Sequence, residues 1–254
     1  MTKQKLGVLI LHGFSSSLDC VSAIETQLKA LDLPTRMPVL RGHGADSPEA
    51  LRGVTWHDWV ADGEAALQDL LTEAEKVIIF GHSMGGLVAL TLAAENEHSV
   101  DSIVLAAAAV QLVSPLAPGR SLHFLMPLVR RFVKKWDLQP DYADPHLAQF
   151  DTNYRWTPMD ALVSFIEFTE VTRRRLAEVR VPTLIIQSQK DTTVAPDSAN
   201  IIYNGISTPL EQKRIVWFKV TDHEMFRDCE RENTVETVVQ YVRERVSLMV
   251  GGAL

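Results

Sequence analysis

Residues 76–97 read KVIIFGHSMGGLVALTLAAENE, and this stretch decides the fold. Its first five residues form an apolar run typical of a strand buried between two layers of helices. A helical pattern follows, and the GHSMG between the two fits G-x-S-x-G. In so sharp a strand-to-helix turn, Ser83 adopts a strained backbone conformation, and a side chain in place of either glycine would collide. This context favours a nucleophile turn over a loop that only connects a strand to a helix.

Similar apolar runs alternate with helical patterns along the rest of the chain. The apolar runs occupy residues 6–11, 35–40, 76–80, 102–107, 182–187 and 214–219. Apolar residues at helical spacing occupy residues 18–31, 56–71, 86–97 and 234–249. The alternation predicts an α/β fold with a mostly parallel, open sheet of about six strands flanked by helices.

One region breaks this alternation. Between residues 111 and 177 no strand run occurs, and two helical stretches, 121–136 and 158–176, lie among several prolines. An irregular segment of this length inside a compact domain is usually functional. We therefore predict a core in two parts, 1–110 and 178–254, with a small helical cap (111–177) inserted after the fourth strand run. The alternative is an ordinary long crossover with additional helices.

Composition excludes several classes of protein. The 254 residues carry a net charge of −7, which argues against nucleic acid as the main partner. Two cysteines are too few for a disulfide framework or a four-cysteine zinc site. The N-terminal apolar run, residues 6–11, is too short for a signal peptide or a membrane span. We expect a cytoplasmic protein without stable membrane insertion, and monomer and dimer remain open.

A serine hydroxyl is a weak nucleophile and requires a base. In this type of turn the acid and then the base follow the serine in the chain, which leaves His98, His123, His146 and His223 as candidate bases. His98 lies at the far end of the helix that Ser83 begins, and the next two lie in the insertion. His223 follows the last strand run, so it is the predicted base.

The predicted acid follows the apolar run 182–187. Asp191 lies four residues beyond this run, in the loop that should face the base. Asp197 is the competing candidate, although its position just before a helical stretch is typical of a helix N-terminal acid. Asp222 is too near His223 in sequence to be the usual partner.

Two backbone N–H groups should stabilise the oxyanion that forms during acyl transfer. The residue after the nucleophile, Met84, supplies the first. The loop after the first strand run supplies the second, from Phe14, with Gly13 allowing close approach. We expect the neighbouring His12 to bond the loop backbone rather than to react.

The predicted cap carries apolar stripes that include Leu125 and Phe165. We expect most of these side chains to pack the cap onto the core, and a few to form an apolar substrate pocket with Phe14. The cap also carries basic clusters at 130–131, 134–135 and 173–175. They are expected to form a solvated face, and attraction to an anionic interface is the second interpretation.

At this point the chain resembles the α/β-hydrolases, and most of all the small bacterial carboxylesterases and monoacylglycerol lipases. The resemblance rests on LHGF (11–14), RGHG (41–44), GHSMGG (81–86), QKD (189–191) and DHEMF (222–226), which occur in family order. The first strand run begins at residue 6, so the two leading strands of the full fold are expected to be absent. Ser188 stands where the family usually has a glycine before the acid.

The resemblance implies a serine carboxylic-ester hydrolase. By similarity Ser83, Asp191 and His223 correspond to the family's nucleophile, acid and base, and Phe14 and Met84 to its oxyanion amides. The implied substrates are small-molecule short- to medium-chain acyl esters or monoacylglycerols, cleaved through an acyl-enzyme without a metal or an organic cofactor. A thioesterase, peptidase, carbon–carbon hydrolase or perhydrolase would keep the same triad, and a hydrolase-like ligand receptor is a further alternative.

Overall fold

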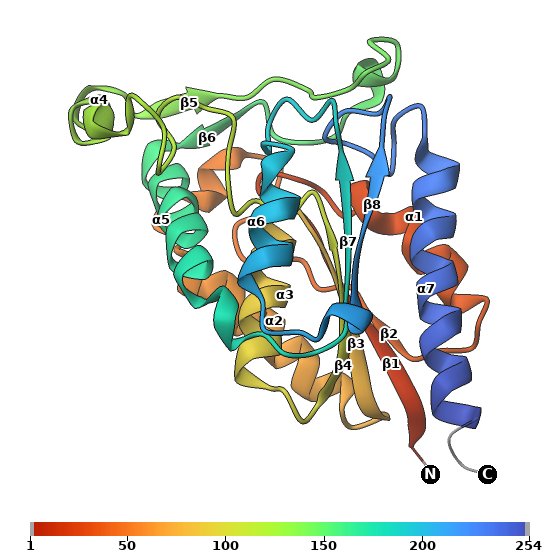
Figure 1. Ribbon diagram of the computed structural model, residues 1–254. Coiled ribbons are helices and arrows are strands. Elements are labelled where there is room, and N and C mark those ends of the chain that lie inside the picture. The colour runs from red at the N-terminus through yellow and green to blue at the C-terminus, as the bar shows by residue number, and fades with distance from the viewer. Residues whose placement is uncertain (1–2, 252–254) are drawn as a thin grey trace.

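The computed structural model describes residues 3–251, which form one central sheet between two layers of helices (Figure 1). The six strands lie in the order β2-β1-β3-β4-β7-β8, and every neighbouring pair is parallel. The strands are β1 (Gln4–Leu11), β2 (Thr35–Arg36), β3 (Ala74–His82), β4 (Val100–Ala106), β7 (Thr183–Ser188) and β8 (Lys213–Phe218). This confirms the predicted fold class.

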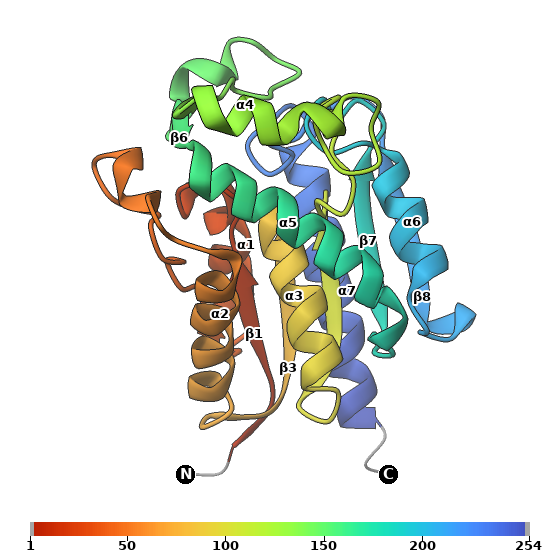
Figure 2. The same cartoon turned by 90° about the vertical axis from the view of Figure 1, so that its left-hand side faces the viewer.

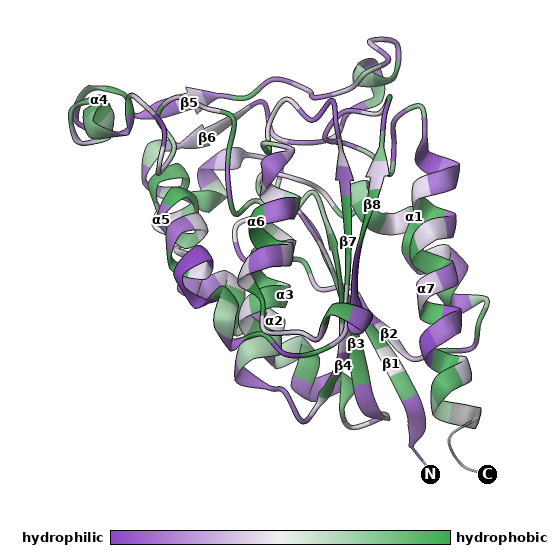
Figure 3. Cartoon of the chain, in the orientation of Figure 1, coloured by the Kyte–Doolittle hydropathy of each residue, from purple (hydrophilic) through white to green (hydrophobic). Residues whose placement is uncertain are grey.

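Helices cover both faces of the sheet because successive strand residues point to opposite sides. In β1, Leu9 and Leu11 belong to the apolar core beneath α2 (Trp56–Leu70), α3 (Met84–Glu95) and α6 (Asp197–Gly205). Val8 and Ile10 belong to the core beneath α1 (Asp19–Lys29) and α7 (Arg231–Gly251). The hydropathy colouring shows mainly apolar strands in the centre of the sheet, between helices that carry both apolar and polar residues (Figure 3). Continuous apolar runs such as LGVLIL are therefore strands that are buried on both faces.

Two expected boundaries differ from the structure. The strand expected over residues 35–40 is only Thr35–Arg36, since Pro38 has no N–H to donate to a neighbouring strand. The strand expected to end before Gly81 continues to His82, and α3 begins at Met84. Ser83 is thus the single residue between strand and helix.

The inserted region is mainly helical but also contains a small sheet. Its helices are η2 (His123–Leu125), α4 (Met126–Phe132), η3 (Leu147–Phe150), α5 (Met159–Arg175) and η4 (Leu176–Glu178). The strands β5 (Lys135–Asp137) and β6 (Trp156–Pro158) pair antiparallel, so the expectation of an insertion without strands was wrong. Three-residue strands are too short to show periodicity. Figure 2 shows α4 above α5, beyond the ends of the strands.

The remaining short helices are η1 (Pro48–Leu51) before α2 and η5 (Leu210–Gln212) before β8. No helix within residues 3–251 has both the length and the apolar composition that a membrane crossing requires.

Candidate active site

The turn at Ser83 has the strained geometry that the glycines predicted. Ser83 has φ 53° and ψ −115°, a combination that a residue with a side chain rarely adopts. A Cβ on Gly81 would lie 2.2 Å from the carbonyl oxygen of Gly85, and a Cβ on Gly85 would lie 2.3 Å from that of Leu11. Neither position has room for a side chain, because the atoms in the way belong to the backbone.

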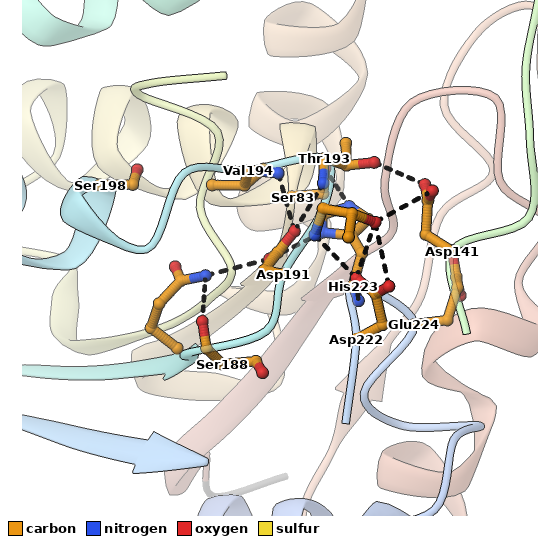
Figure 4. A network of polar contacts seen from close by, with 12 residues as sticks. Ser83, Asp141, Ser188, Asp191, Thr193, Val194, Ser198, Asp222, His223 and Glu224 are labelled. Atoms are coloured by element: carbon orange, nitrogen blue, oxygen red, sulfur yellow. Dashed lines mark hydrogen bonds and ion pairs between the residues drawn. The ribbon is translucent and has the colours of Figure 1, made fainter. Parts of the chain in front are cut away.

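His223 lies between Ser83 and Asp191 in the folded chain (Figure 4). Its Nε2 atom is 3.1 Å from Ser83 Oγ, and its Nδ1 atom is 3.0 Å from Asp191 Oδ2. All three side chains are buried, and each follows the carboxyl end of a different strand: β3, β7 and β8. The structure thus brings together three residues that lie up to 140 positions apart in sequence.

The Asp191 carboxylate is fixed by bonds beyond that to His223. Oδ1 accepts hydrogen bonds from the backbone N–H groups of Thr193 (3.0 Å) and Val194 (2.8 Å). Oδ2 also accepts one from Gln187 Nε2, at 3.0 Å. These donors leave the carboxylate one orientation, with Oδ2 toward the imidazole.

The two competing acids have other positions. Asp197 is the exposed first residue of α6. Asp222 accepts hydrogen bonds from the backbone N–H groups of Thr192, in the loop of the acid, and of His223, in the loop of the base. Asp222 therefore shapes the loop, and Asp191 is the carboxylate in contact with the imidazole.

The environment of His223 favours its charged form. Burial lowers its pKa, but the negative charge and hydrogen bond of Asp191, with help from Glu224 and Asp141, raise it to about 9. A buried imidazolium next to Ser83 is the species that forms when the serine loses its proton. The charge distribution of the site therefore stabilises the imidazolium that forms when Ser83 gives up its proton.

Two backbone N–H groups in the turns next to Ser83 have no hydrogen-bond acceptor among residues 3–251. Met84 is the first residue of α3, so its N–H has no partner within the helix. The N–H of Phe14 likewise donates to no acceptor among residues 3–251. Gly13 allows the loop of Phe14 to approach Ser83 closely, because a Cβ on Gly13 would lie 3.3 Å from the Cβ of Ser83.

A cavity of about 340 Å³ opens over Ser83 and His223. Phe14 and Phe165 lie in its wall and stack on each other, with ring centroids 4.8 Å apart. The apolar part of the wall is completed by Leu112, Val113, Trp136, Leu138, Pro140 and Leu162. The polar part includes Asp141, Asp151, Asn153, Arg155, Thr192, Thr193 and Glu224.

Leu125, expected in the substrate pocket, does not line this cavity. It lies at the end of η2, directly before α4. The apolar wall residues from the inserted segment are instead Leu112, Val113, Trp136, Leu138, Pro140, Leu162 and Phe165. Several of the apolar residues around Leu125, such as Phe124 and Leu128, are exposed, so their spacing does not mark a substrate pocket.

Two supporting histidines were not identified from the sequence. His82 Nε2 donates to the backbone oxygen of His223 at 3.1 Å. His43 Nε2 accepts from the N–H of Ser15, next to Phe14. The motifs GHSMGG and RGHG contain these two histidines, but spacing alone does not reveal their partners.

His12 is buried and bonds the loop backbone, as expected. Its Nδ1–H donates to the oxygen of Gly13, and its Nε2 accepts from the N–H of Leu40. Burial lowers its pKa to about 4, so it remains neutral. Within residues 3–251 no cluster of three or more His, Cys, Asp or Glu side chains could hold a metal ion.

Comparison with known proteins establishes the family. The model of the family described as serine aminopeptidase, S33 (Hydrolase_4), matches residues 2–230. The chain belongs to this α/β-hydrolase family. The predicted resemblance is therefore confirmed.

Relatives of this α/β-hydrolase span nearly its whole length. A thermostable monoacylglycerol lipase from Bacillus sp. (strain H-257) is 28% identical over 93% of this chain and 90% of its own. A carboxylesterase from Bacillus subtilis (strain 168) is 24% identical over 93% and 92%. Among solved structures, one from a study of the metagenome-derived lipolytic enzymes LipS and LipT superposes with a TM-score of 0.85 at 25% identity, covering 96% and 95%.

Proposed function

We propose that this hydrolase is a serine esterase that cleaves short- to medium-chain acyl esters or monoacylglycerols through an acyl-enzyme. The observation that carries the proposal is the hydrogen-bonded series from Ser83 through His223 to Asp191, with distances of 3.1 and 3.0 Å, at the base of a half-apolar cavity. The names of the Bacillus relatives, a monoacylglycerol lipase and a carboxylesterase, support the same substrate class.

The proposed reaction has two halves. His223 Nε2 takes the Ser83 proton as Oγ attacks the ester carbonyl, and the N–H groups of Phe14 and Met84 stabilise the oxyanion. The imidazolium then protonates the leaving alcohol, which departs and leaves an acyl-serine. Water repeats the sequence and releases the carboxylic acid. Asp191 holds the imidazole tautomer with the Nδ1–H toward itself and stabilises the imidazolium.

The two sides of the cavity suggest how an ester is held. We propose that the acyl chain lies along the apolar wall that includes Phe14 and Phe165, because burial of methylene groups there is favourable. The alcohol then lies toward the polar wall, where Asn153 and Thr192 offer hydrogen-bonding groups. This arrangement fits a substrate with one apolar end and one polar end.

A chain-length series tests the proposal. We expect turnover of p-nitrophenyl acetate, butyrate and octanoate and of a monoacylglycerol, with palmitate slower because of the cavity volume. Ser83→Ala should lower kcat by about 10⁴–10⁶-fold on every ester. The exposed Ser121→Ala, outside the cavity lining, is the matched control and should keep full activity. Normal turnover by the Ser83 variant would overturn the proposal.

A peptidase is the second candidate, because the matching family is described as a serine aminopeptidase. The carboxylates of Asp141 and Glu224 in the cavity wall are groups that could bind a substrate ammonium. Aminoacyl p-nitroanilides in the same assay separate the two activities. Faster turnover of the anilides than of the esters would favour the peptidase.

We propose a cap spanning residues 111–177, which limited proteolysis between α4 and α5 would probe. We also propose a cytoplasmic location, for which the support is that Cys20 and Cys229 are both free thiols. Fractionation of cells that express the protein tests it.

A further inference from the structure

The outer side of the cap combines exposed apolar side chains with a high positive charge. Residues 120–135 read RSLHFLMPLVRRFVKK and contain no Asp or Glu. Phe124, Leu128 and Phe132 follow one another at intervals of four residues and are 72%, 57% and 72% exposed. We call these three, together with Arg130, Arg131 and Lys134, the α4 face.

The α4 face is not needed to hold the cap together. Met126 is buried, and Val129 and Val133 pack against the main core, so these residues anchor η2 and α4. Figure 1 shows α4 at the edge of the molecule, beyond the sheet and its helices. Exposed large apolar groups gathered on one element are typical of a binding surface.

A groove beside α4 adds unpaired cations to the apolar residues. Arg130, Arg131 and Lys134 line it together with Arg52, Pro127, Met159, Asp160 and Val163. Asp160, its single acid, lies 3.8 Å from Arg52, which also pairs with Glu49. Arg130, Arg131 and Lys134 form no ion pair with any residue between 3 and 251. The groove therefore offers three free cations to an anion.

We propose that the α4 face docks on an anionic phospholipid surface. Phe124, Leu128 and Phe132 enter the boundary between headgroups and acyl chains, and the three cations contact lipid phosphates. The combination of protruding aromatic side chains with cations, and of no acids in residues 120–135, fits a negatively charged apolar interface.

A second copy of the chain fits this surface less well. Stable dimers bury about 800 Å² on each partner, and the α4 face is a single helix of seven residues with the turn before it. Docking also places lipid close to the active site, because α4 leads directly into β5, whose Trp136 lines the cavity.

Vesicle co-sedimentation of the full-length protein tests the proposal. We expect binding to vesicles of about seven parts phosphatidylcholine to three parts phosphatidylglycerol, and not to phosphatidylcholine alone. Arg130→Gln/Arg131→Gln/Lys134→Gln should weaken binding about a hundredfold at low salt. Phe124→Ser/Phe132→Ser should weaken it by at least about tenfold. Raising the salt from about 0.1 M to about 0.5 M should weaken binding by the wild-type protein.

Matched variants separate the α4 face from charge and apolarity in general. Lys3→Gln/Lys29→Gln/Lys219→Gln removes three exposed cations that lie outside residues 111–177. Leu210→Ser removes an apolar side chain, also outside this segment, that is 71% exposed. Both should bind vesicles like the wild type. All variants should hydrolyse a water-soluble ester normally if the esterase proposal holds, and thermal unfolding checks their folding independently.

Failure of the wild type to bind anionic vesicles, or equal weakening by the α4-face variants and the matched variants, would overturn the proposal. A dimer in sedimentation velocity that Phe124→Ser/Phe132→Ser abolishes, without vesicle binding, would assign the surface to a second copy instead. Binding requires no catalysis, so Ser83→Ala should bind vesicles normally, and failure of either proposal leaves the other intact.

Discussion

His82 Nε2 lies 3.1 Å from the backbone oxygen of His223 and links the nucleophile turn to the loop of the base. Both residues are buried, and their rings lie 5.0 Å apart. Burial is the main reason that the pKa of His82 falls to about 4, so its ring is neutral and has one N–H to donate. His82 therefore acts as a positioning residue that sets where the His223 imidazole lies.

Removing this hydrogen bond should lower kcat and leave KM nearly unchanged. For His82→Leu we expect a loss of about 10–100-fold, because small displacements of a catalytic group are costly. His82→Gln retains an N–H donor and should recover part of the loss. The measurement is kcat and KM on p-nitrophenyl butyrate. Equal kcat losses in the two variants would show that His82 only fills space.

The pKa of His223 sets the pH dependence of the reaction. Only the neutral imidazole accepts the Ser83 proton, and the folded protein holds this pKa at about 9, above the ordinary value of 6.5. The rate should therefore rise with pH, about tenfold per unit, and level off near pH 9. The measurement is kcat/KM on a neutral ester, corrected for spontaneous hydrolysis.

Asp191→Asn checks the cause of this shift. The variant lacks the negative charge that raises the His223 pKa, so its profile should level off at lower pH. It should also lower kcat by about 10⁴-fold, since the amide favours the wrong imidazole tautomer. A profile with the same midpoint as the wild type would show that Asp191 does not control the charge of the imidazole.

Asp228 links the segment around Ala143 to the loop of the base through a buried carboxylate. Its oxygens accept hydrogen bonds from the N–H groups of Asp222 (2.7 Å), Cys229 (2.8 Å), Ala143 (2.8 Å) and Asp144 (3.2 Å). Asp228→Ala leaves these groups without an acceptor and should lower the free energy of unfolding by about 3–5 kcal/mol. Denaturant unfolding measures the loss.

The matched variant is Asp197→Ala, at the exposed N-terminus of α6, which should cost no more than about 1 kcal/mol. The sign of the pH effect follows from the pKa of Asp228, which backbone hydrogen bonds hold below its usual value despite burial. The contribution of Asp228 to the free energy of unfolding is fully present above the ordinary carboxyl pKa. It is lost as the pH falls through the lowered pKa of the folded protein. Equal losses in the two variants would contradict the proposed link.

Gly85 is required for steric reasons rather than for backbone flexibility. A Cβ there would lie 2.3 Å from the oxygen of Leu11 and 2.7 Å from that of His12, in the strand and loop beneath the nucleophile. Gly85→Ala should prevent normal folding or displace Ser83, as measured by thermal unfolding and by ester turnover. Gly53 has φ +75°, but a Cβ added there would meet no atom within 4 Å, so Gly53→Ala should cost only about 1–2 kcal/mol. A Gly85→Ala protein as stable and active as Gly53→Ala would refute the steric argument.

The parts of the structure that were most predictable from the sequence are those fixed by interactions between residues close in sequence. The glycines around Ser83 and the apolar run before them predict a strand, a turn and a helix, because steric exclusion acts over a few residues. The order of motifs then indicates Asp191 and His223, which the fold brings together at the carboxyl ends of parallel strands.

The sequence was uninformative where a partner lies far along the chain. Asp228 accepts the N–H of Ala143, 85 positions away, and neither residue belongs to a motif. Strand β5 has three residues, too few for periodicity. Leu125 has the apolar spacing of a pocket residue, but that spacing does not reveal that η2 and α4 contribute no residue to the cavity wall.

The most direct test of the central claim is covalent labelling of Ser83 with a fluorophosphonate, followed by peptide mass spectrometry. We predict one equivalent of label, located on Ser83, with labelling slowed by orders of magnitude in His223→Ala and unaffected in His98→Ala. Absence of label, its location on another residue, or equal labelling of the wild type and His223→Ala would contradict the assignment of Ser83 as the nucleophile and His223 as its base.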